Sequence, residues 1–550
     1  MSVKVLIVGG VAGGASAAAR LRRLNEAMEI IIFERGEHIS YANCGLPYYI
    51  SGVIAERDAL LVQTPGGMKD RFQIDVRTHS EVTRIFPEER VVEVQEKNGH
   101  IYRESYDELI LSPGAAPVRP PIPGIDTIEA FVVRNVSDID QIKGYIDEQQ
   151  QQTAVVVGGG FIGLEMAENL SERGVQTTII EMSNQVMAPL DFEMAAILHD
   201  HIFSKGVNLI LEDGVKAFDK EENKTIITLQ SGEQIQTDLT IIAIGVRPEI
   251  KLAKEAGLTI GDLGGIKVNE KLQSSDPHIY AIGDAIEVKH LITGEAALLP
   301  LAGPANKQGR IVADVISGRE SRYKGTQGTS IAKIFDLVAA STGANEKILK
   351  KLGISYEISF THSASNAGYY PGGKRLSIKL IFERNEGRVL GAQIVGSQGV
   401  DKRIDDIAGV IRREGTIYDL QELELAYAPP FSSAKDPVNM AGYVAENIII
   451  GDVRTIQWYE VQKMNPKDVC IIDVRTEVER RGKFIVGSLH IPIDDLRNHL
   501  SELPKDKDIV LYCEIGLRGY LAYRILSQHG FTRVKNLNGG WVTYYPAVFG

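Results

Sequence analysis

The chain has 550 residues, a length that predicts about three or four domains. Hydrophobic residues make up 44% of it and charged residues 24%, and 60 basic against 72 acidic residues leave a net charge of -12. These values exclude a disordered chain and argue against a general nucleic-acid binder. With no apolar run of about 18 residues, we expect no membrane-spanning helix. The three cysteines, Cys44, Cys470 and Cys513, form no disulfide framework and favour a reducing, cytoplasmic compartment.

The first 34 residues read as strand, turn, helix and strand. Apolar strands are expected over Val3–Val8 and Ile30–Phe33, and an alanine-rich helix over Ala15–Leu24. The turn between them consists of Gly9, Gly10, Val11, Ala12, Gly13 and Gly14. Glycines allow a tight turn, the helix start faces a pyrophosphate, and Glu34 can accept ribose hydroxyls. The pattern predicts a dinucleotide site in which Val11 replaces the usual middle glycine.

A second turn of the same kind follows the short strand Ala154–Val157. Its glycines, Gly158, Gly160 and Gly163, occupy all three glycine positions of the motif. A helix is expected up to Arg173 with Gly174 as its cap, and the strand Thr177–Ile180 leads into Glu181. That carboxylate lies where a 2'-phosphate would sit, so charge repulsion favours NADH over NADPH, although NADPH stays possible.

A third signal is a strand from Ile279 that ends on Gly283 and Asp284. The Asp284 carboxylate could meet a polyol hydroxyl, or it could simply cap a helix. Strand ends also fall at Leu111–Gly114 and Ala243–Gly245. Together with the two glycine turns, these features resemble the two-dinucleotide-fold flavoprotein disulfide reductases over residues 1 to about 445.

The resemblance implies FAD at the first turn and the late Gly-Asp pair, and the nicotinamide nucleotide at the second turn. The positions it assigns to the two cofactors are Gly9, Gly10, Val11, Ala12, Gly13, Gly14, Glu34, Arg35, Asn43, Pro113, Gly114, Gly158, Gly160, Phe161, Ile162, Gly163, Glu181, Gly245, Gly283 and Asp284.

Cys44 stands alone on its segment, because Tyr49 occupies the position five residues later, where most family members carry a second cysteine. Cys44 must then pair with an outside partner, as a mixed disulfide, a persulfide or a sulfenate from peroxide. The alternative is a buried apolar cysteine. A helix start and a flavin close by would stabilise its thiolate. The segment from Ser40 to Tyr48 resembles the coenzyme A-disulfide reductases.

Basic residues near this segment suit an anionic adenosine 3'-phosphate diphosphate, or they form an ordinary solvated basic face. Arg20 and Arg23 share a helix face, and Arg71 follows later. At one family contact position this chain has Phe72 where some relatives have lysine, so that phosphate contact is lost or moves to Arg71. The substrate positions expected for coenzyme A are Ser16, Arg20, Arg23, Ser40, Asn43, Arg71, Asn306 and Lys435.

Residues 325–445 contain a strand from Ile331 and a hairpin that joins Leu376–Phe382 to Val389–Val395. In the family this is the dimer-interface domain, which implies a homodimer. Tyr369 and Tyr427 match tyrosines that reach the partner's cysteine, where their hydroxyls would stabilise or protonate a leaving thiolate. Without the resemblance, the alternative that both are packed aromatics with a hydrogen-bonded tip has equal weight.

The last 98 residues restart the pattern with strands at Val469–Asp473 and Ile509–Tyr512 and a helix at Tyr520–Gln528. Cys513 at a strand end and Arg518 five positions on resemble a rhodanese loop, in which backbone N–H groups hold a persulfide. A cysteine-dependent phosphatase carries its arginine six positions after the cysteine, and here that position is Gly519. Glu514 replaces a cation of thiosulfate-using relatives, which points to protein-bound, thiol-bound or polysulfide sulfur instead. Cys470 is expected in the core. For the whole C-terminal module, the alternative is an inactive domain that only mediates interactions.

We therefore expect an α/β protein with two Rossmann-like domains, an α+β dimerisation domain and a rhodanese domain. The expected ranges are 1–150 with 271–324 for FAD, 151–270 for NAD(P), 325–445 for dimerisation and 453–550 for rhodanese. The expected activity is NADH-dependent, FAD-dependent reduction of coenzyme A disulfide, persulfide or polysulfide, coupled to sulfur transfer. The first alternative is an NADH oxidase or peroxidase with a cysteine sulfenate. The second is a sulfur-delivery module on a flavoprotein scaffold or sensor. No metal, nucleic acid or membrane is expected.

Overall fold

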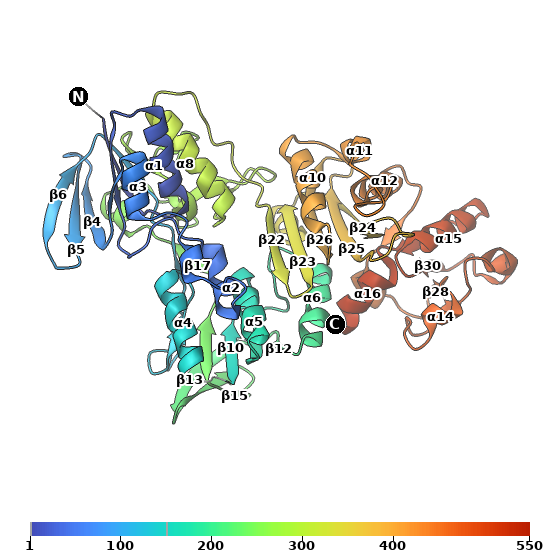
Figure 1. The fold of residues 1–550 in the computed structure, drawn as a ribbon. Helices are drawn as coiled ribbons and strands as arrows, with labels where there is room; N and C mark the ends of the chain where they lie inside the picture. The colour runs from blue at the N-terminus through green and yellow to red at the C-terminus, as the bar shows by residue number, and fades with distance from the viewer. Residues whose placement is uncertain (1–2, 150–151) are drawn as a thin grey trace. The chain divides into compact units, whose positions relative to one another are not determined.

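The computed structural model describes residues 3–149 and 152–550, and the chain divides into two compact units (Figure 1). The first unit holds the chain up to Ser183 together with Val207–Gly328, and the second holds Asn184–Gly206 and Thr329–Gly550. Within the described ranges, no helix has the length and apolar character needed to cross a membrane.

The first unit contains a parallel five-stranded sheet in the order β19-β7-β1-β2-β3. Its strands are β1 (Lys4–Val8), β2 (Glu29–Phe33), β3 (Asp75–Arg77), β7 (Glu108–Leu111) and β19 (Ile279–Ala281). Parallel strands covered on both faces carry continuous apolar runs, and Val5, Leu6 and Ile7 of β1 are fully buried. Helices α1 (Ala12–Leu24) and α8 (Ala302–Ile316) pack against each other. The helix predicted from Ala15 begins at Ala12, inside the glycine turn.

A second parallel sheet in the same unit has the order β12-β11-β10-β16-β9. Its strands are β9 (Ala130–Phe131), β10 (Thr153–Val157), β11 (Gln176–Ile180), β12 (Asn208–Ile210) and β16 (Leu239–Ile242). Helix α5 (Phe161–Glu172) follows β10, and Gly174 is left-handed with φ 81°, which confirms the expected helix end. Two antiparallel sheets complete the unit's larger strands: β4 (Ser80–Phe86), β5 (Val91–Glu96) and β6 (Ile101–Ser105), and β13 (Val215–Glu221), β14 (Lys224–Leu229) and β15 (Gln234–Thr237).

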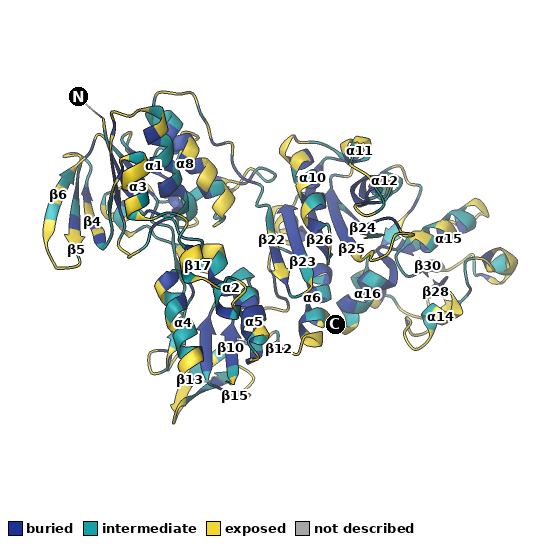
Figure 2. Cartoon of the chain, viewed as in Figure 1, coloured by how far each residue is buried: buried dark blue, intermediate teal, exposed yellow. Residues whose placement is uncertain are grey.

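The second unit contains an antiparallel sheet in the order β22-β23-β26-β25-β24, whose strands are largely buried (Figure 2). The strands are β22 (Ser330–Ile334), β23 (Leu337–Gly343), β24 (Glu357–Ala364), β25 (Arg375–Phe382) and β26 (Val389–Gly396). Pairing of β25 with β26 confirms the predicted hairpin. Helices α10 (Val400–Arg412) and α12 (Pro437–Ile449) pack on this sheet.

A C-terminal parallel sheet in the same unit has the order β27-β31-β30-β28-β29. Its strands are β27 (Thr455–Ile456), β28 (Val469–Asp473), β29 (Leu489–His490), β30 (Asp508–Tyr512) and β31 (Val534–Leu537). Helices α14 (Glu477–Arg480), α15 (Leu517–Gln528) and α16 (Gly540–Phe549) accompany it. The strand at Val469–Asp473 has the predicted bounds, and α15 begins three residues before the predicted Tyr520.

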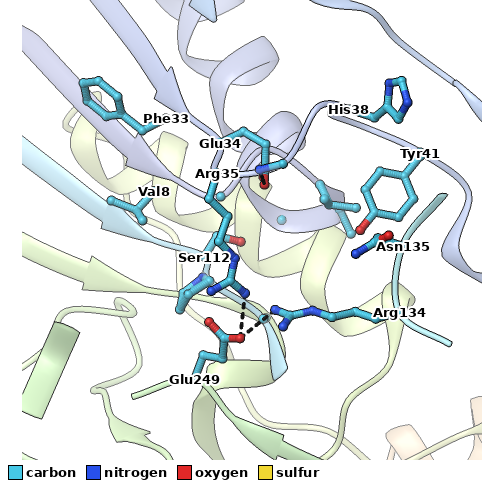
Figure 3. A pocket seen from close by; sticks show the side chains of 18 of the residues that line it. Val8, Phe33, Glu34, Arg35, His38, Tyr41, Ser112, Arg134, Asn135 and Glu249 are labelled. Carbon is cyan, nitrogen blue, oxygen red and sulfur yellow. Dashed lines mark hydrogen bonds and ion pairs between the residues drawn. The ribbon is translucent and has the colours of Figure 1, made fainter. Parts of the chain in front are cut away.

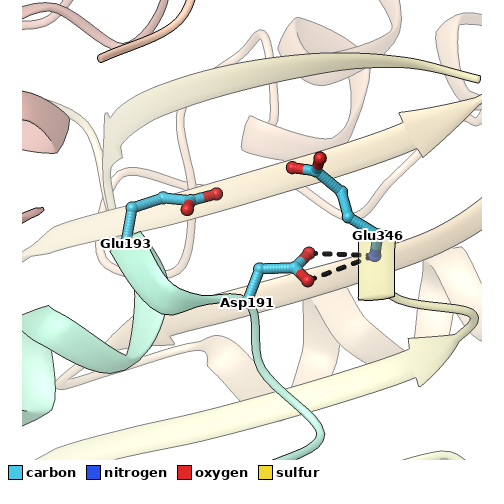
Figure 4. A group of neighbouring side chains, drawn as sticks. All are labelled: Asp191, Glu193 and Glu346. Carbon is cyan, nitrogen blue, oxygen red and sulfur yellow. Dashed lines mark hydrogen bonds between the residues drawn. The ribbon is translucent and has the colours of Figure 1, made fainter. Parts of the chain in front are cut away.

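A fully buried lysine, Lys379, lies inside the second unit, and Figure 4 shows the three carboxylates that contact it. Lys379 Nζ on β25 is 2.5 Å from Glu193, 2.6 Å from Glu346 and 2.8 Å from Asp191. Burial alone would lower the pKa of Lys379, but these carboxylates outweigh it and hold the pKa above its usual value. Burial likewise opposes ionisation of Glu346, yet Lys379 brings the pKa of that carboxyl to about 2. The charges therefore depend on one another.

Replacing Lys379 by methionine should lower the free energy of unfolding of the second unit by about 3–5 kcal/mol, because three buried carboxylates would lose their counter-charge. Urea unfolding followed by tryptophan fluorescence reports on this unit, since Trp458 and Trp541 are the chain's two tryptophans. The matched control is Lys350→Met, whose side chain is 58% exposed and pairs with the same Glu346. It should cost less than about 1 kcal/mol, and equal losses in both variants would contradict the account.

Candidate active site

The first unit contains a cavity of about 470 Å³ beside the carboxyl ends of its first parallel sheet (Figure 3). Ligands of open α/β sheets bind at this end of the strands. The sequence-predicted cofactor positions that line the cavity are Gly9, Val11, Ala12, Gly13, Glu34, Arg35, Asn43, Pro113, Gly114, Gly283 and Asp284. Segments far apart in the sequence therefore converge on one groove.

The first glycine turn leaves no room for a side chain at Gly9 or Gly14. A Cβ on Gly9 would lie 2.1 Å from the Ser112 carbonyl oxygen, and one on Gly14 would lie 1.9 Å from the Gly9 oxygen. The Gly10 N–H donates to Glu34 Oε2 at 3.0 Å, which fixes the acid beside the turn. Val11 has a negative φ of -95°, so this position tolerates a side chain where the usual pattern has glycine.

The second glycine turn is built in the same way. A Cβ on Gly158 would lie 2.4 Å from the Ala243 oxygen, and one on Gly163 would lie 1.9 Å from the Gly158 oxygen. Glu181 Oε2 accepts from the Gly159 N–H at 2.8 Å, as Glu34 does in the first turn. A Cβ on Gly160 would meet no atom within 4 Å, so open space lies before α5, whose first residues are Phe161 and Ile162. Both turns therefore fit a dinucleotide pyrophosphate at a helix start.

An ion-pair cluster at the groove was not predicted. Glu249 Oε1 lies 2.6 Å from Arg35 Nη2 and 2.7 Å from Arg134 Nη2 (Figure 3). Burial opposes ionisation of Glu249, but the two arginines outweigh it and hold the pKa of Glu249 below its usual value. The antiparallel pairing of β17 (Val246–Pro248) with β8 (Ala115–Pro117) brings Glu249 to this place, and Gly245 directly precedes β17 with a left-handed φ of 110°. No local sequence pattern announces such a pairing.

Cys44 lies on the 3-10 turn Asn43–Gly45, next to a groove-lining residue, and it is exposed. Partial desolvation raises the pKa of its thiol, and the charges of Glu165 and Asp284 raise the pKa further. The stabilised thiolate expected for a cysteine near a helix start is therefore not what the chain itself provides. Its charged neighbours are carboxylates, and the helix that follows, α2 (Leu46–Ser51), has only six residues.

Glu165 of α5 connects the second glycine turn to Cys44, and the sequence analysis missed it. Burial raises the pKa of Glu165 to about 7, with a contribution from Glu168 one turn later on the same helix. Two carboxylates three residues apart on one face of the predicted helix were the available signal. A group that titrates near neutral pH therefore stands close to the cysteine.

The predicted coenzyme A positions are partly brought together. Ser16 Oγ of α1 donates to Asn306 Oδ1 of α8 at 2.5 Å. Arg20 makes two hydrogen bonds with Asp314 Oδ1, at 3.0 and 2.8 Å, so its charge is already balanced. The remaining cations, Arg23 and Arg71, are exposed in the first unit, and Lys435 is exposed in the second. Ser40 precedes the Cys44 turn with a left-handed φ of 46°, and Phe72 packs against the core of the first sheet.

Cys513 is fully buried at the end of β30, and its Sγ accepts a hydrogen bond from the Gly516 N–H at 3.2 Å. Arg518 donates to both carboxylate oxygens of Glu479, at 2.7 and 2.5 Å. The hydrogen bonds with Glu479 raise the pKa of Arg518, and the interaction with Cys513 adds to the effect. Backbone N–H and guanidinium together form a nest for an anionic sulfur.

Glu514 contacts two arginines, with Arg475 Nη1 at 3.5 Å and Arg375 Nη2 at 3.8 Å. Arg475 also pairs with Asp473 at 2.9 Å, and the expectation that Glu514 disfavours thiosulfate stays a prediction. Cys470 on β28 is half-buried and packs against the core of the C-terminal sheet, in line with the core position expected for it.

Tyr369 and Tyr427 meet in the second unit, where their hydroxyl oxygens are 2.8 Å apart. Both side chains are exposed, at 77% and 46%, and Phe431 nearby in the sequence is 71% exposed. The pair is thus not packed in a core, and within this chain the two hydroxyls bond to each other.

The fold and these sites match three family models. Pyridine nucleotide-disulphide oxidoreductase covers residues 3–309, its dimerisation domain covers 329–437, and the rhodanese-like domain covers 447–547. The chain therefore belongs to the pyridine nucleotide-disulphide oxidoreductases and is an oxidoreductase with a dimerisation domain and a C-terminal rhodanese-like domain.

The similar proteins are more specific. A coenzyme A disulfide reductase of Staphylococcus haemolyticus is 37% identical over 447 residues, which is 81% of this chain and 100% of that protein. The crystal structure of reduced CoADR-RHD from Bacillus anthracis has 54% identity and a TM-score of 0.97, covering 100% of this chain and 98% of that one. A NAD-dependent persulfide reductase from A. fulgidus has 38% identity and a TM-score of 0.93, covering 98% and 100%.

Replacing Glu165 by glutamine should lower the pKa of the Cys44 thiol, because a carboxylate that is ionised above about pH 7 disfavours the thiolate. Alkylation of Cys44 by iodoacetamide at about pH 8, resolved by peptide mass spectrometry of the reduced holoenzyme, should become about two- to threefold faster. The control Glu172→Gln lies exposed on the same helix and should change nothing. An unchanged or slower rate in Glu165→Gln would contradict this electrostatic coupling.

Proposed function

We propose that the protein is an FAD-dependent reductase that oxidises NADH and reduces coenzyme A disulfide or coenzyme A persulfide at Cys44. The disulfide reaction is CoA–S–S–CoA + NADH + H⁺ → 2 CoA–SH + NAD⁺. The persulfide reaction is CoA–S–SH + NADH + H⁺ → CoA–SH + H₂S + NAD⁺. The names of the similar proteins support both, because they include coenzyme A disulfide reductases and a NAD-dependent persulfide reductase.

The observation that carries the proposal is a solitary, exposed cysteine between the two glycine turns. Asn43 beside it lines the first groove, Glu165 of the second turn's helix acts on its pKa, and Tyr49 stands where an internal partner would be. Bound FAD would carry electrons from the nicotinamide to this cysteine. Cys44 itself would attack the sulfur of the substrate, keep one sulfur in a mixed disulfide and release the other as a thiol.

The substrate would lie over α1 and α8. Ser16 and Asn306 would contact coenzyme A, and the exposed cations Arg23 and Arg71 would meet its phosphates. Ser40 and Asn43 would position the substrate beside Cys44. Arg20 would line the same surface, with its charge already paired to Asp314.

The dimerisation domain supports a homodimer. In that dimer, Tyr369 and Tyr427 would reach Cys44 of the partner subunit and donate a proton to the leaving thiolate. Their hydrogen bond raises the pKa of Tyr427, so its hydroxyl stays protonated at neutral pH. Lys435 of the same unit would contact the coenzyme A phosphates. The three free cysteines support a cytoplasmic location.

The rhodanese-like domain would supply sulfur. A persulfide on Cys513 would be held by the Gly516 N–H and Arg518, and it would pass to coenzyme A: Cys513–S–SH + CoA–SH → Cys513–SH + CoA–S–SH. The coenzyme A persulfide would then be the substrate of Cys44. Having both cysteines on one chain raises the effective concentration of this sulfur at the reductase.

An NADH oxidase or peroxidase is the second candidate. The water-forming NADH oxidase of Lactobacillus brevis has 27% identity to this chain and a TM-score of 0.78, covering 82% of this chain and 99% of that one. An exposed Cys44 could also cycle through a sulfenate.

Cys44→Ser should lower anaerobic NADH-dependent reduction of coenzyme A disulfide and persulfide by at least about a thousandfold, because the sulfur that exchanges with the substrate is gone. Cys470→Ser is the matched control and should retain turnover. The measurement is NADH consumption without oxygen against a panel of coenzyme A disulfide, coenzyme A persulfide, polysulfide and peroxide. Turnover of peroxide alone by the wild type would favour the second candidate, and full activity of Cys44→Ser would overturn the first.

Cys513→Ala should leave the reduction of added coenzyme A disulfide unchanged but lower polysulfide reduction in the presence of coenzyme A by about tenfold or more, since the relay through the rhodanese-like domain is cut. Sulfide release measures the polysulfide reaction. Unchanged sulfide release from polysulfide would show that sulfur reaches Cys44 without Cys513.

A further inference from the structure

β24 has β25 as its strand partner within the described sheet, so its other side offers backbone groups that need partners. The side chain of Asn538 meets that need. Its Nδ2 donates to the Ile358 oxygen at 2.9 Å, and its Oδ1 accepts from the Phe360 N–H at 3.1 Å. Asn538 is 4% exposed. Its amide thus pairs with the strand as the peptide group of a neighbouring strand would.

A second contact lies two residues further along the strand. His362 is fully surrounded by protein, with Nδ1 2.8 Å from Ser377 Oγ and Nε2 2.9 Å from Thr543 Oγ1 of α16. Burial lowers the pKa of His362 to about 3, so its ring stays neutral and can serve both partners. Residues 538–543 comprise the turn after β31 and the start of α16, and we call them the 538–543 loop. Asn538 and Thr543 tie both ends of this loop to the antiparallel sheet. Figure 1 shows α16 and β24.

The same loop is hydrogen-bonded to the backbone of the Cys513 loop. The Trp541 N–H donates to the Cys513 oxygen at 2.8 Å, and the Val542 N–H donates to the Glu514 oxygen at 3.0 Å. Gly540, at φ 62°, fits so closely that a Cβ there would lie 2.5 Å from the Cys513 oxygen and 2.8 Å from the Gly516 nitrogen. This Gly516 nitrogen is the donor to Cys513 Sγ.

The 538–543 loop also packs directly against β24. A Cβ on Gly539 would lie 2.9 Å from Phe360 Cβ of β24, so the strand packs against the turn itself. Trp458 Nε1 adds a bond to Glu193 Oε2 at 3.3 Å elsewhere in this unit. A shift of the loop relative to β24 would therefore be felt at the backbone that surrounds the sulfur.

We propose that Asn538 is a positioning residue for sulfur transfer, which fixes the 538–543 loop to β24 and thereby holds the Gly516 N–H on Cys513 Sγ. The sulfurtransferase loop is then completed by the dimerisation domain, and full activity requires both parts of the chain. The inference rests on the sulfur-transfer step of the proposed function.

The test compares Asn538→Leu, which keeps the side-chain volume but makes neither hydrogen bond, with Asn465→Leu, an exposed asparagine of the same domain. In Asn538→Leu, kcat for transfer of sulfur from polysulfide to coenzyme A should fall at least about tenfold with little change in KM, because the loop geometry and not donor access is affected. Reduction of coenzyme A disulfide should stay within about twofold of the wild type. Asn465→Leu should behave as the wild type in both assays.

Hydrogen exchange supplies a readout that needs no sulfur donor. Amides of residues 514–519 should exchange at least about tenfold faster in Asn538→Leu, while the β30 peptide keeps its protection. If that variant does not fold, Asn538→Asp, which retains the acceptor for the Phe360 N–H, should show a smaller change in the same direction. Unchanged exchange of residues 514–519 together with unchanged kcat would overturn the proposal. Wild-type protein that transfers no sulfur from any donor, with exchange still dependent on Asn538, would count against the proposed function alone.

Discussion

Cys44 is held on an exposed turn beside the dinucleotide groove, and its own segment offers it no second sulfur, since Tyr49 occupies the position of the usual partner. Under the proposed function, its sulfur would then exchange with a molecule from outside the chain. The surrounding charges fit this demand. Partial desolvation raises the pKa of the thiol, Glu165 and Asp284 raise it further, and a thiol of higher pKa is a poorer leaving group. In the proposed mixed disulfide, these surroundings would therefore disfavour release of Cys44.

Charged side chains fix geometry in several parts of this acidic chain. Glu249 lies between two arginines at the groove, Glu514 between two arginines at the C-terminal loop, and Lys379 among three carboxylates. In the buried Lys379 group, removing one partner leaves a buried charge without compensation, which costs far more than the intact group contributes. These clusters define where segments far apart in the sequence must meet, so they position the groove and the loops more than they add stability.

Local sequence patterns predicted the strands and glycine turns well, because apolar runs and glycines act over a few residues. The start of α1 was misplaced by three residues, since Gly13 and Gly14 suggest a loop, whereas here they lie within the helix so that it can approach Gly9 closely. The pairing of Arg20 with Asp314 could not be foreseen, because the two residues are 294 positions apart.

The same limit applies to the contacts that join domains. The carboxylate of Glu249 reaches the groove only through the pairing of β17 with β8, and Asn538 reads locally as part of a glycine-rich turn, although its amide serves a strand 180 residues away. Lys379 alternates with apolar neighbours on β25 in a pattern that usually places a lysine in solvent. Its burial depends on Asp191, Glu193 and Glu346, which come from two other segments.

Intact and peptide mass spectrometry of the purified protein, denatured without a reducing agent, shows whether Cys44 binds coenzyme A covalently. A mixed disulfide at Cys44 predicts an adduct with the mass of coenzyme A on the peptide that contains Cys44, released by thiol reductants and missing from Cys44→Ser. An unmodified Cys44, or one that carries only oxygen atoms even after incubation with coenzyme A disulfide, would contradict it.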